Sequence, residues 1–401
     1  MTVLINYPKN FLRYDLIRDV TKHVKRGHRW IFSDCFASTE KFQDGPALVT
    51  FKKQQLAFVV VQKDTHLRAR IIVLLNEKDS VDFQLKKYFQ SQWLKTLELR
   101  AQFPNELTNS FRFINGEGDG FPGLIIDIYN DTAVIKHDHP VMEEIWNHEK
   151  LVEWLKRDLP YLKCIYLKRK NDEEEKGANL YGELSPEVSF KENGVQFTSN
   201  IRDAAKTGFF LDQRDNRKMI SHFSKGKKVL NLFSYTGGFS VYAAIGGASE
   251  VTSVDIAAAA VAASQKNFDI NGLKNTHHAI HADAFEFLET AQKEKKTWDI
   301  VITDPPSFAP NQKALPKAIE GYTRVYASSI KLVPNGGLFV ASSCSSHISQ
   351  EQFLEILQNS FSTARRKGTV VSIGGQPSDH PFPLVMSELR YLKFAIFRLD
   401  D

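Results

Sequence analysis

The sequence predicts an α/β protein whose C-terminal half is a mostly parallel sheet with helices on both faces. From about residue 196 onward, seven runs with strand character alternate with helical patterns, and this alternation is typical of such a sheet. Residues 1–75 contain short β-rich runs instead, and residues 76–195 mix both patterns. We therefore expect three domains, 1–75, 76–195 and 196–401, which suits a chain of 401 residues at roughly 100–200 residues per domain.

The first 75 residues predict a small barrel or sandwich, because several short strands at close spacing are typical of those folds. The β-rich runs are residues 29–32, 47–51, 56–61 and 70–74. Between Lys9 and Arg29 stand seven basic residues against two acidic ones, with aromatic residues interleaved. Two interpretations stay open for this stretch: a solvated face, or a surface that contacts phosphates with stacking groups nearby.

The segment 76–195 predicts an α+β domain. Apolar residues at helical spacing favour helices over 84–102 and 142–155. A tight glycine-rich loop at 116–123 leads into an apolar run, and the dense mixed charges of 168–176 predict an exposed loop or a hairpin tip.

The C-terminal domain has the most regular pattern. Strands are expected at 228–234, 251–256, 278–282, 299–303, 338–342, 370–373 and 393–398, and helices at 257–271, 284–293, 316–332 and 350–362. No clear helix separates the last two strands, so we expect a terminal hairpin whose last strand runs antiparallel. Ligands of such sheets bind beyond the carboxyl ends of the strands, where the strand order reverses.

Residues at the ends of the first three strands suit a nucleotide-like ligand. The first strand runs into 231–239, where Gly237 and Gly238 let the backbone approach a ligand closely. Asp255 ends the second strand and can accept hydrogen bonds from ribose hydroxyls. The segment 283–285 ends the third strand, where it can meet an adenine ring. The dinucleotide fingerprint G-x-G-x-x-G is missing here, so these residues alone indicate only a nucleotide-like ligand.

The fourth strand ends in Asp304-Pro305-Pro306, which is a more specific signal. Two prolines fix the backbone after the strand and would present carbonyl groups and Asp304 to a target base. An ordinary structural turn is the alternative. Cys344 follows the next strand, and neighbouring strands lie about 5 Å apart. Both side chains could therefore flank one base.

On these motifs the chain resembles the class I methyltransferases of bacterial large-subunit rRNA that carry a PUA domain, the cytosine-5 type. The matching segments are 206–214 (KTGFFLDQR), 231–239, 304–308 and 343–345, with 27–32 similar to the opening of the PUA domain and 116–123 similar to the central linking domain. The resemblance covers nearly the whole chain in order. It implies a Rossmann-like methyltransferase domain with a seven-stranded sheet, preceded by an N-terminal β-barrel PUA domain and a central α+β domain.

The resemblance also implies a cofactor and a partner. The cofactor would be S-adenosyl-L-methionine and the partner 23S rRNA, free or partly assembled, with no membrane partner and with a homodimer left open. The implied cofactor-binding residues are Phe210, Gln213, Phe233, Ser234, Tyr235, Gly237, Asp255, Ile256, Asp283, Ala284 and Asp304.

Cys344 is the residue that favours cytosine as the target base. Carbon 5 of cytosine is a poor nucleophile, and a thiolate that adds to carbon 6 makes it reactive, which is covalent catalysis. Asp304 is the candidate for donating a proton or hydrogen bond near ring nitrogen 3, and a carboxyl that donates must be protonated, which burial favours. The fourth-strand motif contains no cysteine, so a single-cysteine mechanism is implied, and the sequence identifies no base for the carbon-5 proton.

Three alternatives remain open. Cys344 could be a buried core cysteine. The same scaffold resembles enzymes that methylate guanine, so a guanine or another RNA acceptor is possible. The chain could also be an RNA-binding protein with a vestigial catalytic domain, although intact Asp255, Asp304 and Cys344 argue against that.

Bulk composition sets wider limits. The chain is 42% hydrophobic and 25% charged, which predicts a folded core. It has no apolar run of about 18 residues and no signal-peptide pattern, so we expect a cytoplasmic protein. A net charge of +5 is only a weak indication of nucleic acid. Cys35 and Cys164 are expected to be small buried hydrophobes, and the histidines near 277–281 are not expected to bind metal.

Overall fold

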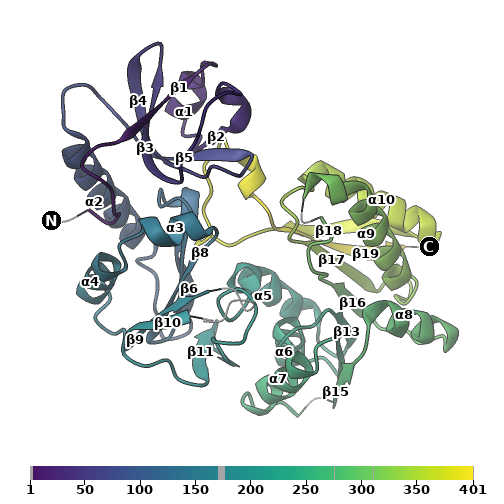
Figure 1. Cartoon of the computed structure of the whole chain (residues 1–401). Coiled ribbons are helices and arrows are strands. Elements are labelled where there is room, and N and C mark those ends of the chain that lie inside the picture. Colours follow the sequence, from purple (N-terminus) through teal and green to yellow (C-terminus); the bar gives the residue numbers. More distant parts are fainter. Residues whose placement is uncertain (1–2, 170–176, 275, 310, 401) are drawn as a thin grey trace. The chain divides into compact units, whose positions relative to one another are not determined.

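The computed structural model describes residues 3–169, 177–274, 276–309 and 311–400 (Figure 1), which form two compact units. Unit 1 comprises Met1–Lys191, Ser199–Phe209 and Ser378–Ser387, and unit 2 comprises Glu192–Thr198, Phe210–Pro377 and Glu388–Asp401. No helix among the described residues is both long and apolar enough to cross a bilayer.

The first sheet of unit 1 has five strands in the order β1-β3-β4-β5-β2. The strands are β1 (Leu12–Leu16), β2 (Trp30–Phe32), β3 (Gly45–Phe51), β4 (Gln54–Val61) and β5 (Leu67–Leu74), with the helix α1 (Thr21–Lys25) between β1 and β2. Each of the four predicted β-rich runs overlaps a strand, whereas β1 was not predicted. Within the described ladders β1 and β2 are the two edges, so the hydrogen-bonded sheet is open.

The second sheet of unit 1 also has five strands, in the order β10-β9-β8-β7-β6. These are β6 (Ser110–Asn115), β7 (Leu124–Tyr129), β8 (Thr132–His137), β9 (Cys164–Lys168) and β10 (Gly177–Tyr181), accompanied by the helices α2 (Val81–Leu99), α3 (Pro140–Ile145) and α4 (His148–Asp158). The two strands β11 (Val188–Glu192) and β12 (Val195–Ser199) pair separately. The predicted helix 84–102 corresponds to α2.

The single helix predicted over 142–155 is wrong, because the chain forms two helices there. Asn147 leaves the helical conformation, and its side chain accepts a hydrogen bond from the backbone N–H of Lys150 at 3.0 Å. An asparagine in this role starts a new helix. The predicted charged loop falls between β9 and β10, which pair antiparallel, but residues 170–176 lie outside the described part of the chain. Lys168 itself is buried.

One apolar core joins the two sheets of unit 1. Leu48, Phe58 and Ile72 from the first sheet belong to the same buried cluster as Phe89 of α2 and Ile126 of β7. Residue 75 therefore marks a change of sheet and not a break in the core. The division into domains at 75 and 195 stays a prediction.

The segment Ser378–Ser387 returns to unit 1 from the C-terminal part of the chain. The backbone N–H of Arg112 donates to Asp379 Oδ2 at 3.0 Å, and Asn115 Nδ2 donates to the carbonyl of Pro381 at 2.7 Å. A Cβ atom on Gly118 would lie only 1.9 Å from that carbonyl oxygen. The glycine-rich loop therefore has a packing role, because only glycine fits where Pro381 passes.

Unit 2 contains a seven-stranded sheet in the order β15-β14-β13-β16-β17-β19-β18. Its strands are β13 (Lys228–Leu232), β14 (Glu250–Asp255), β15 (Thr276–His281), β16 (Ile300–Thr303), β17 (Leu338–Ser343), β18 (Lys367–Gly374) and β19 (Lys393–Asp400). Neighbours pair in parallel except that β19 is antiparallel to both β17 and β18. The predicted seven strands and the antiparallel last strand are confirmed.

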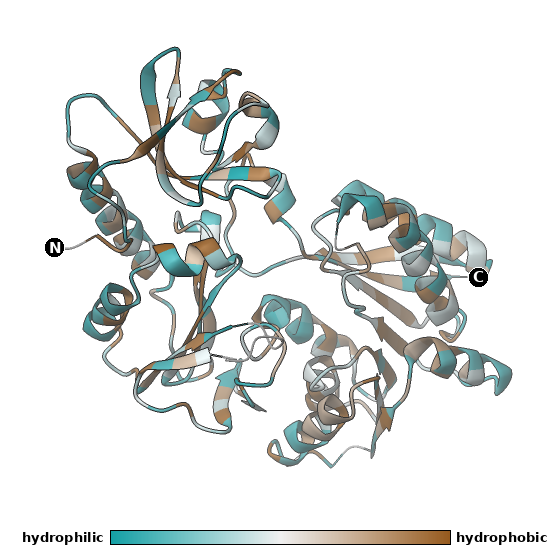
Figure 2. Cartoon of the chain, viewed as in Figure 1, coloured by the Kyte–Doolittle hydropathy of each residue, from teal (hydrophilic) through white to brown (hydrophobic). Residues whose placement is uncertain are grey.

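Helices cover both faces of this sheet (Figure 1), and apolar residues are found on its strands and on the helices that pack against them (Figure 2). The helices are α5 (Arg214–Phe223), α6 (Gly238–Ile245), α7 (Ala258–Asp269), α8 (Ala284–Lys293), α9 (Leu315–Ile330) and α10 (Gln350–Ala364). The predicted terminal hairpin needs a correction. Its two strands pair as expected, but the connection between them is long and carries Ser378–Ser387, which belongs to unit 1.

Candidate active site

The carboxyl ends of five strands meet at one edge of the sheet in unit 2. Leu232 of β13 is in register with Val254 of β14 on one side and with Thr303 of β16 on the other. Thr303 is in register with Ala341 of β17. The strand order reverses at β13, which is where ligands of such sheets bind. The segments after β13, β14, β15, β16 and β17 therefore surround one site.

The loop after β13 has an unusual backbone. Phe233, Tyr235 and Gly237 have φ angles of 57°, 48° and 79°, and the first two are unusual for residues with a side chain. A Cβ atom on Gly237 would lie 2.3 Å from Ser264 Oγ on α7. Asn267, also on α7, donates from Nδ2 to the carbonyl of Thr236 at 2.9 Å. The loop is therefore held in a strained conformation, which is typical of functional sites.

Two hydroxyl groups of this loop are buried without a hydrogen-bond partner in the described part of the protein. They are Ser234 Oγ and Thr236 Oγ1, and both residues are no more than 7% exposed. Buried polar groups in native proteins nearly always have a partner, so an orphaned pair calls for an explanation. A bound ligand with polar groups would provide it.

Asp255 stands at the end of β14 and orders the loop beside it. Its Oδ2 accepts from the backbone N–H of Tyr235 at 2.8 Å, and its Oδ1 accepts from that of Ala257 at 2.9 Å. A carboxylate has about four acceptor positions, so each oxygen can still accept from a ligand. The next residue, Ile256, is 67% exposed and presents an apolar surface beside this carboxylate.

Asp283 ends the third strand region and begins α8. Its Oδ1 accepts from the backbone N–H groups of Phe285 and Glu286 at 2.8 and 3.1 Å, which is a helix N-cap. Ala284 is buried in the first turn of α8. The ring of Phe285 is half-buried and lies 4.5 Å from the guanidinium carbon of Arg324.

Gln213 connects the segment before α5 to the end of β16. Its Nε2 donates to Asp304 Oδ2 and to Ser342 Oγ, both at 2.9 Å. Its Oε1 accepts from Asn216 Nδ2 at 2.6 Å. Gln213 is only 3% exposed, so this network fixes the Asp304 carboxyl. Phe210 lies in the same segment, and its ring contacts that of Tyr235 edge-on with centroids 5.1 Å apart.

Cys344 follows β17 and is half-buried. Two tyrosines of α9 line the same region. Tyr326 donates to the carbonyl of Ser342 at 2.6 Å, and Tyr322 donates to the carbonyl of Pro306 at 3.4 Å. Burial raises the pKa of Tyr322 to about 12, and negative charge at Cys344 and at Asp304 adds to this rise. The buried phenol of Tyr322 therefore interacts electrostatically with both Cys344 and Asp304, the two residues that the sequence placed after neighbouring strands.

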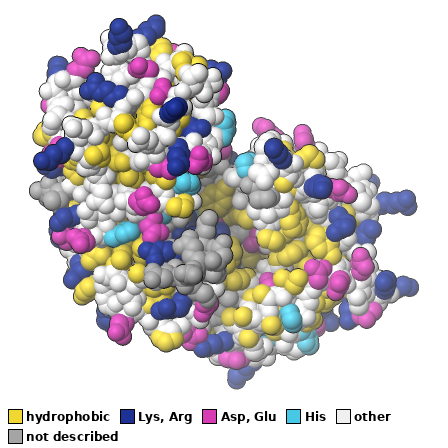
Figure 3. Space-filling view, viewed as in Figure 1, with side chains coloured by type: hydrophobic (Ala, Val, Ile, Leu, Met, Phe, Trp, Pro, Cys, Tyr) yellow, Lys and Arg dark blue, Asp and Glu magenta, His cyan; other side chains and the backbone are white. Residues whose placement is uncertain are grey.

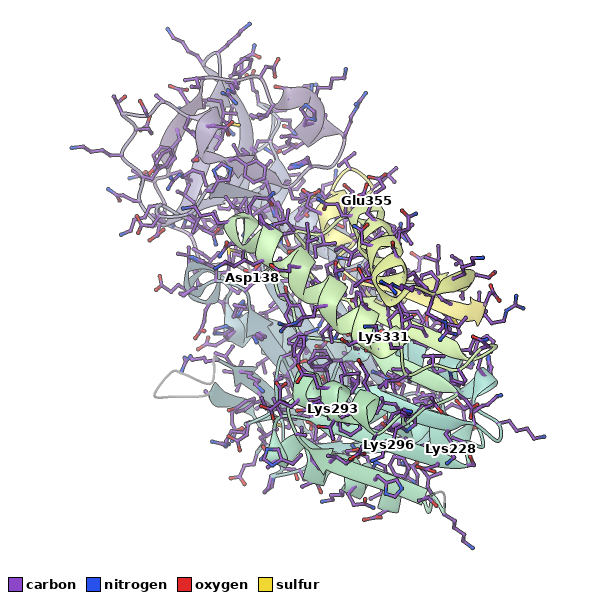
Figure 4. All side chains as sticks on the ribbon, turned by 90° about the vertical axis from the view of Figure 1, so that its right-hand side faces the viewer. Asp138, Lys228, Lys293, Lys296, Lys331 and Glu355 are labelled. Atoms are coloured by element: carbon purple, nitrogen blue, oxygen red, sulfur yellow. The ribbon has the colours of Figure 1, made fainter. Side chains whose placement is uncertain are left out.

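All eleven predicted cofactor-binding residues, and Cys344, lie in unit 2. The motif 206–214 is divided, because Ser199–Phe209 belongs to unit 1 and Phe210 begins a part of unit 2. Lys228, Lys293 and Lys331 stand where β13 begins and where α8 and α9 end, at the opposite edge of the sheet (Figure 4).

Sequence reasoning missed Asn216, Tyr322 and Lys393. Asn216 stands three residues after Gln213, so helical spacing could have indicated it. Lys393 is a charged residue that opens an apolar strand and is 1% exposed, and such a burial is rare enough to be a signal. Nothing local distinguishes Tyr322.

The other cysteines and the histidine group are accounted for by packing. Cys35 and Cys164 are buried and free, as predicted, and burial raises the pKa of Cys164 to about 11. His277 stacks on Phe268 with ring centroids 3.7 Å apart, and its Nε2 lies 2.9 Å from Ser253 Oγ. Over the described ranges, no group of three or more metal-ligating side chains comes together.

Comparison with known proteins identifies the family. Residues 163–369 match the model of a family described as S-adenosylmethionine-dependent methyltransferases. The chain belongs to this family. The methyltransferase is also 32% identical, over 408 residues, to the ribosomal RNA large subunit methyltransferase of Deinococcus radiodurans, and the match covers 97% of this chain and 98% of that protein.

Further relatives give the same result. The ribosomal RNA large subunit methyltransferase I of Alteromonas mediterranea is 32% identical to the methyltransferase over 391 residues, which cover 95% of this chain and 97% of that protein. A methyltransferase solved as a complex with SAH is 27% identical, superposes with a TM-score of 0.85, and is matched over 96% of this chain and 100% of that one. S-adenosylmethionine is therefore the cofactor of the methyltransferase.

The residues present fit that cofactor. The orphaned hydroxyls of Ser234 and Thr236 suit its polar groups. The spare acceptor positions of Asp255 suit a ribose.

Proposed function

We propose that the methyltransferase methylates carbon 5 of a cytosine in 23S rRNA through a covalent adduct with Cys344. The observation that carries this proposal is the position of Cys344 and Asp304, which follow the neighbouring parallel strands β17 and β16 at the edge where the loop after β13 lies. The names of the Deinococcus and Alteromonas relatives support large-subunit rRNA as the substrate. Such a substrate also favours a cytoplasmic enzyme.

The segments that follow β13, β14, β15 and β16 would hold the cofactor, whose sulfonium methyl group would supply the electrophile. Asp255 would accept hydrogen bonds from the ribose, and Ile256 would cover one face of the adenine. Asp283 would accept from the adenine edge through Oδ2, since its Oδ1 already caps α8. The remaining lining is Phe210, Gln213, Phe233, Ser234, Tyr235, Gly237, Ala284 and Asp304.

The Cys344 thiolate adds to carbon 6 of the base. A sulfur–carbon bond forms, and the electron pair of the C5=C6 double bond makes carbon 5 nucleophilic. Carbon 5 would then take the methyl group as its bond to the sulfonium sulfur breaks, and SAH would be released. A base removes the carbon-5 proton, the sulfur–carbon bond breaks, and the ring double bond returns. The described residues do not single out that base.

Asp304 is proposed to bind the base at ring nitrogen 3. Gln213 Nε2 holds the Asp304 carboxyl by donating to its Oδ2, and in this proposal the protonated carboxyl donates toward ring nitrogen 3. A carboxylic acid in this position donates a hydrogen bond and disperses the charge that develops on the ring. The target base must be unpaired or flipped out of a helix to reach both groups.

Unit 1 supplies the RNA contacts in this proposal, with its first sheet as a PUA-like domain. Six of the seven basic residues between Lys9 and Arg29 are exposed, and three of them, Lys22, Lys25 and Arg26, stand together on α1 and its C-cap. Arg29 contributes less, because it donates to the carbonyl of Ile72 at 3.2 Å. Tyr14 is 4% exposed, so it stacks in the core and not on a base. Lys and Arg side chains are spread over this unit with acidic ones between them (Figure 3).

Mass spectrometry of nucleosides tests the proposal. Undermodified 23S rRNA is incubated with the enzyme and isotope-labelled S-adenosylmethionine, digested and analysed. We expect labelled 5-methylcytidine. The Cys344→Ala variant should lose at least about a thousandfold in rate and retain SAH affinity, while Cys35→Ala serves as the matched control with full activity. Labelled methylguanosine, or an active Cys344→Ala enzyme, would exclude the cysteine mechanism.

A further inference from the structure

Lys393 is a buried cation whose side chain is bound to the segment that carries the proposed nucleophile. It opens β19 and is in register with Ser343 of β17, one residue before Cys344. Lys393 is 1% exposed. A lysine is almost never buried to this extent unless its charge is matched.

The ammonium group is held by carbonyl groups. Lys393 Nζ donates to the carbonyl of Ser345 and to that of Tyr391, the latter at 2.8 Å. No carboxylate in the described ranges forms an ion pair with it. These two bonds use two N–H groups, and a neutral amine also has two. Lys393 can therefore gain or lose its third proton without breaking either bond.

The charge of Lys393 is coupled to that of Cys344. Burial lowers the pKa of Lys393 to about 8, and negative charge at Cys344 raises it again. The other titratable groups of this region are Tyr322 and Tyr326 on α9, which interact with both Cys344 and Asp304. Asp212 accepts from Tyr391 Oη at 2.7 Å. Burial raises the pKa of both tyrosines, so they stay neutral near pH 8.

We propose that Lys393 is the positioning residue that generates and stabilises the Cys344 thiolate. The neutral amine of Lys393 takes the thiol proton, which leaves a thiolate beside an ammonium group. When the sulfur–carbon bond breaks after methyl transfer, the same ammonium group stabilises the leaving thiolate. A cation beside a cysteine is the usual way in which proteins make a thiol reactive. This inference rests on the proposed role of Cys344 as the nucleophile.

The test measures the reactivity of Cys344 without methyl transfer. In a Cys35→Ala/Cys164→Ala protein, the rate of alkylation by iodoacetamide is followed from pH 6 to pH 10. Lys393→Gln keeps donors for the two carbonyls but removes the charge, and Lys393→Arg keeps the charge. The matched control is Lys228→Gln, at the opposite edge of the sheet (Figure 4).

We expect Lys393→Gln to raise the pH midpoint of alkylation by about one unit or more, and to slow the reaction at pH 7 about tenfold. Lys393→Arg and Lys228→Gln should keep the midpoint of the parent protein. SAH affinity reports whether each variant is folded. An unchanged midpoint in folded Lys393→Gln would overturn the inference.

If Lys393→Gln does not fold, the pH midpoint of Cys344 alkylation in the parent protein is the test. A midpoint at or above the ordinary thiol value of about 8.5 also overturns the inference. Methylguanosine as the product would instead contradict the proposed function. The alkylation experiment would still report whether Lys393 lowers the pH midpoint of Cys344, because it does not depend on methyl transfer.

Discussion

An ion pair buried in the core of unit 1 and two hydroxyls buried at the strand ends of unit 2 differ in whether the protein itself supplies their hydrogen-bond partners. In unit 1, Arg100 and Asp119 are both nearly inaccessible and form two hydrogen bonds of 2.7 Å. In unit 2, the buried hydroxyls of Ser234 and Thr236 have no partner among the described residues. The first arrangement is complete within the protein, whereas the second is complete only with a ligand.

This difference separates stability from binding. Removing one member of a satisfied buried pair leaves an uncompensated charge, which destabilises the fold. Removing an unsatisfied hydroxyl takes away a group that was unfavourable to bury, so it leaves the fold intact and weakens only the ligand complex. Substitutions in the buried ion pair of unit 1 should therefore change mainly the free energy of unfolding. Substitutions of the two hydroxyls in unit 2 should change mainly the affinity for SAH.

The largest expected effect is that of Asp119→Asn. The neutral amide leaves the Arg100 charge buried, so the free energy of unfolding should fall by about 3–5 kcal/mol, as measured by urea denaturation. Asp34→Asn is the control, because the Arg18–Asp34 pair is more than half exposed and surface pairs contribute at most about 1 kcal/mol. Equal losses in the two variants would contradict the assignment of Arg100–Asp119 to the core.

The next effect is that of Gly118→Ala, where the new Cβ meets the carbonyl oxygen of Pro381. Overpacking against backbone should lower the free energy of unfolding by about 3 kcal/mol. Gly321→Ala in α9 is the matched control, since its Cβ has only ordinary contacts with Phe308 and alanine favours a helix. A Gly118→Ala protein as stable as the parent would show that Ser378–Ser387 does not need this close approach.

A smaller effect on binding is expected for Ser234→Ala combined with Thr236→Val. The affinity for SAH, measured by calorimetry, should fall about tenfold, because two hydrogen bonds to the ligand are lost. The free energy of unfolding without ligand should stay the same or rise slightly. A clear loss of stability together with normal SAH affinity would reverse the comparison between the two units.

The smallest effect concerns pH. Burial, and then the neighbouring His148, lowers the pKa of His137 in unit 1 from 6.5 to about 3. The unfolded chain therefore binds more protons between these values, so stability is full above pH 6.5 and falls as the pH drops toward 3. Between pH 7 and pH 5.5 the parent should lose about 1 kcal/mol more than His137→Gln. Parallel pH curves for the two proteins would show that His137 titrates normally.

Much of unit 2 followed from the sequence because its signals are local. Alternating apolar and amphipathic runs predicted the seven strands, and strand ends in a parallel sheet meet at one edge wherever the helices lie. Asp255, Asp304 and Cys344 could therefore be placed together without coordinates. In unit 1, short strands and a polar break such as Asn147 gave weaker patterns, so β1 was missed and α3 and α4 were merged.

The sequence by itself determined the class of the catalytic domain, the edge of the sheet that holds the site, and the residues that end its strands. Tertiary structure alone decided which distant groups reach that edge. Gln213 reaches Asp304 across 91 positions of sequence, and Lys393 reaches the carbonyl of Ser345 across 48. It also decided that Ser378–Ser387 belongs to unit 1. Local patterns record which face of an element is apolar, but the partner of a buried polar group depends on how the chain returns in space.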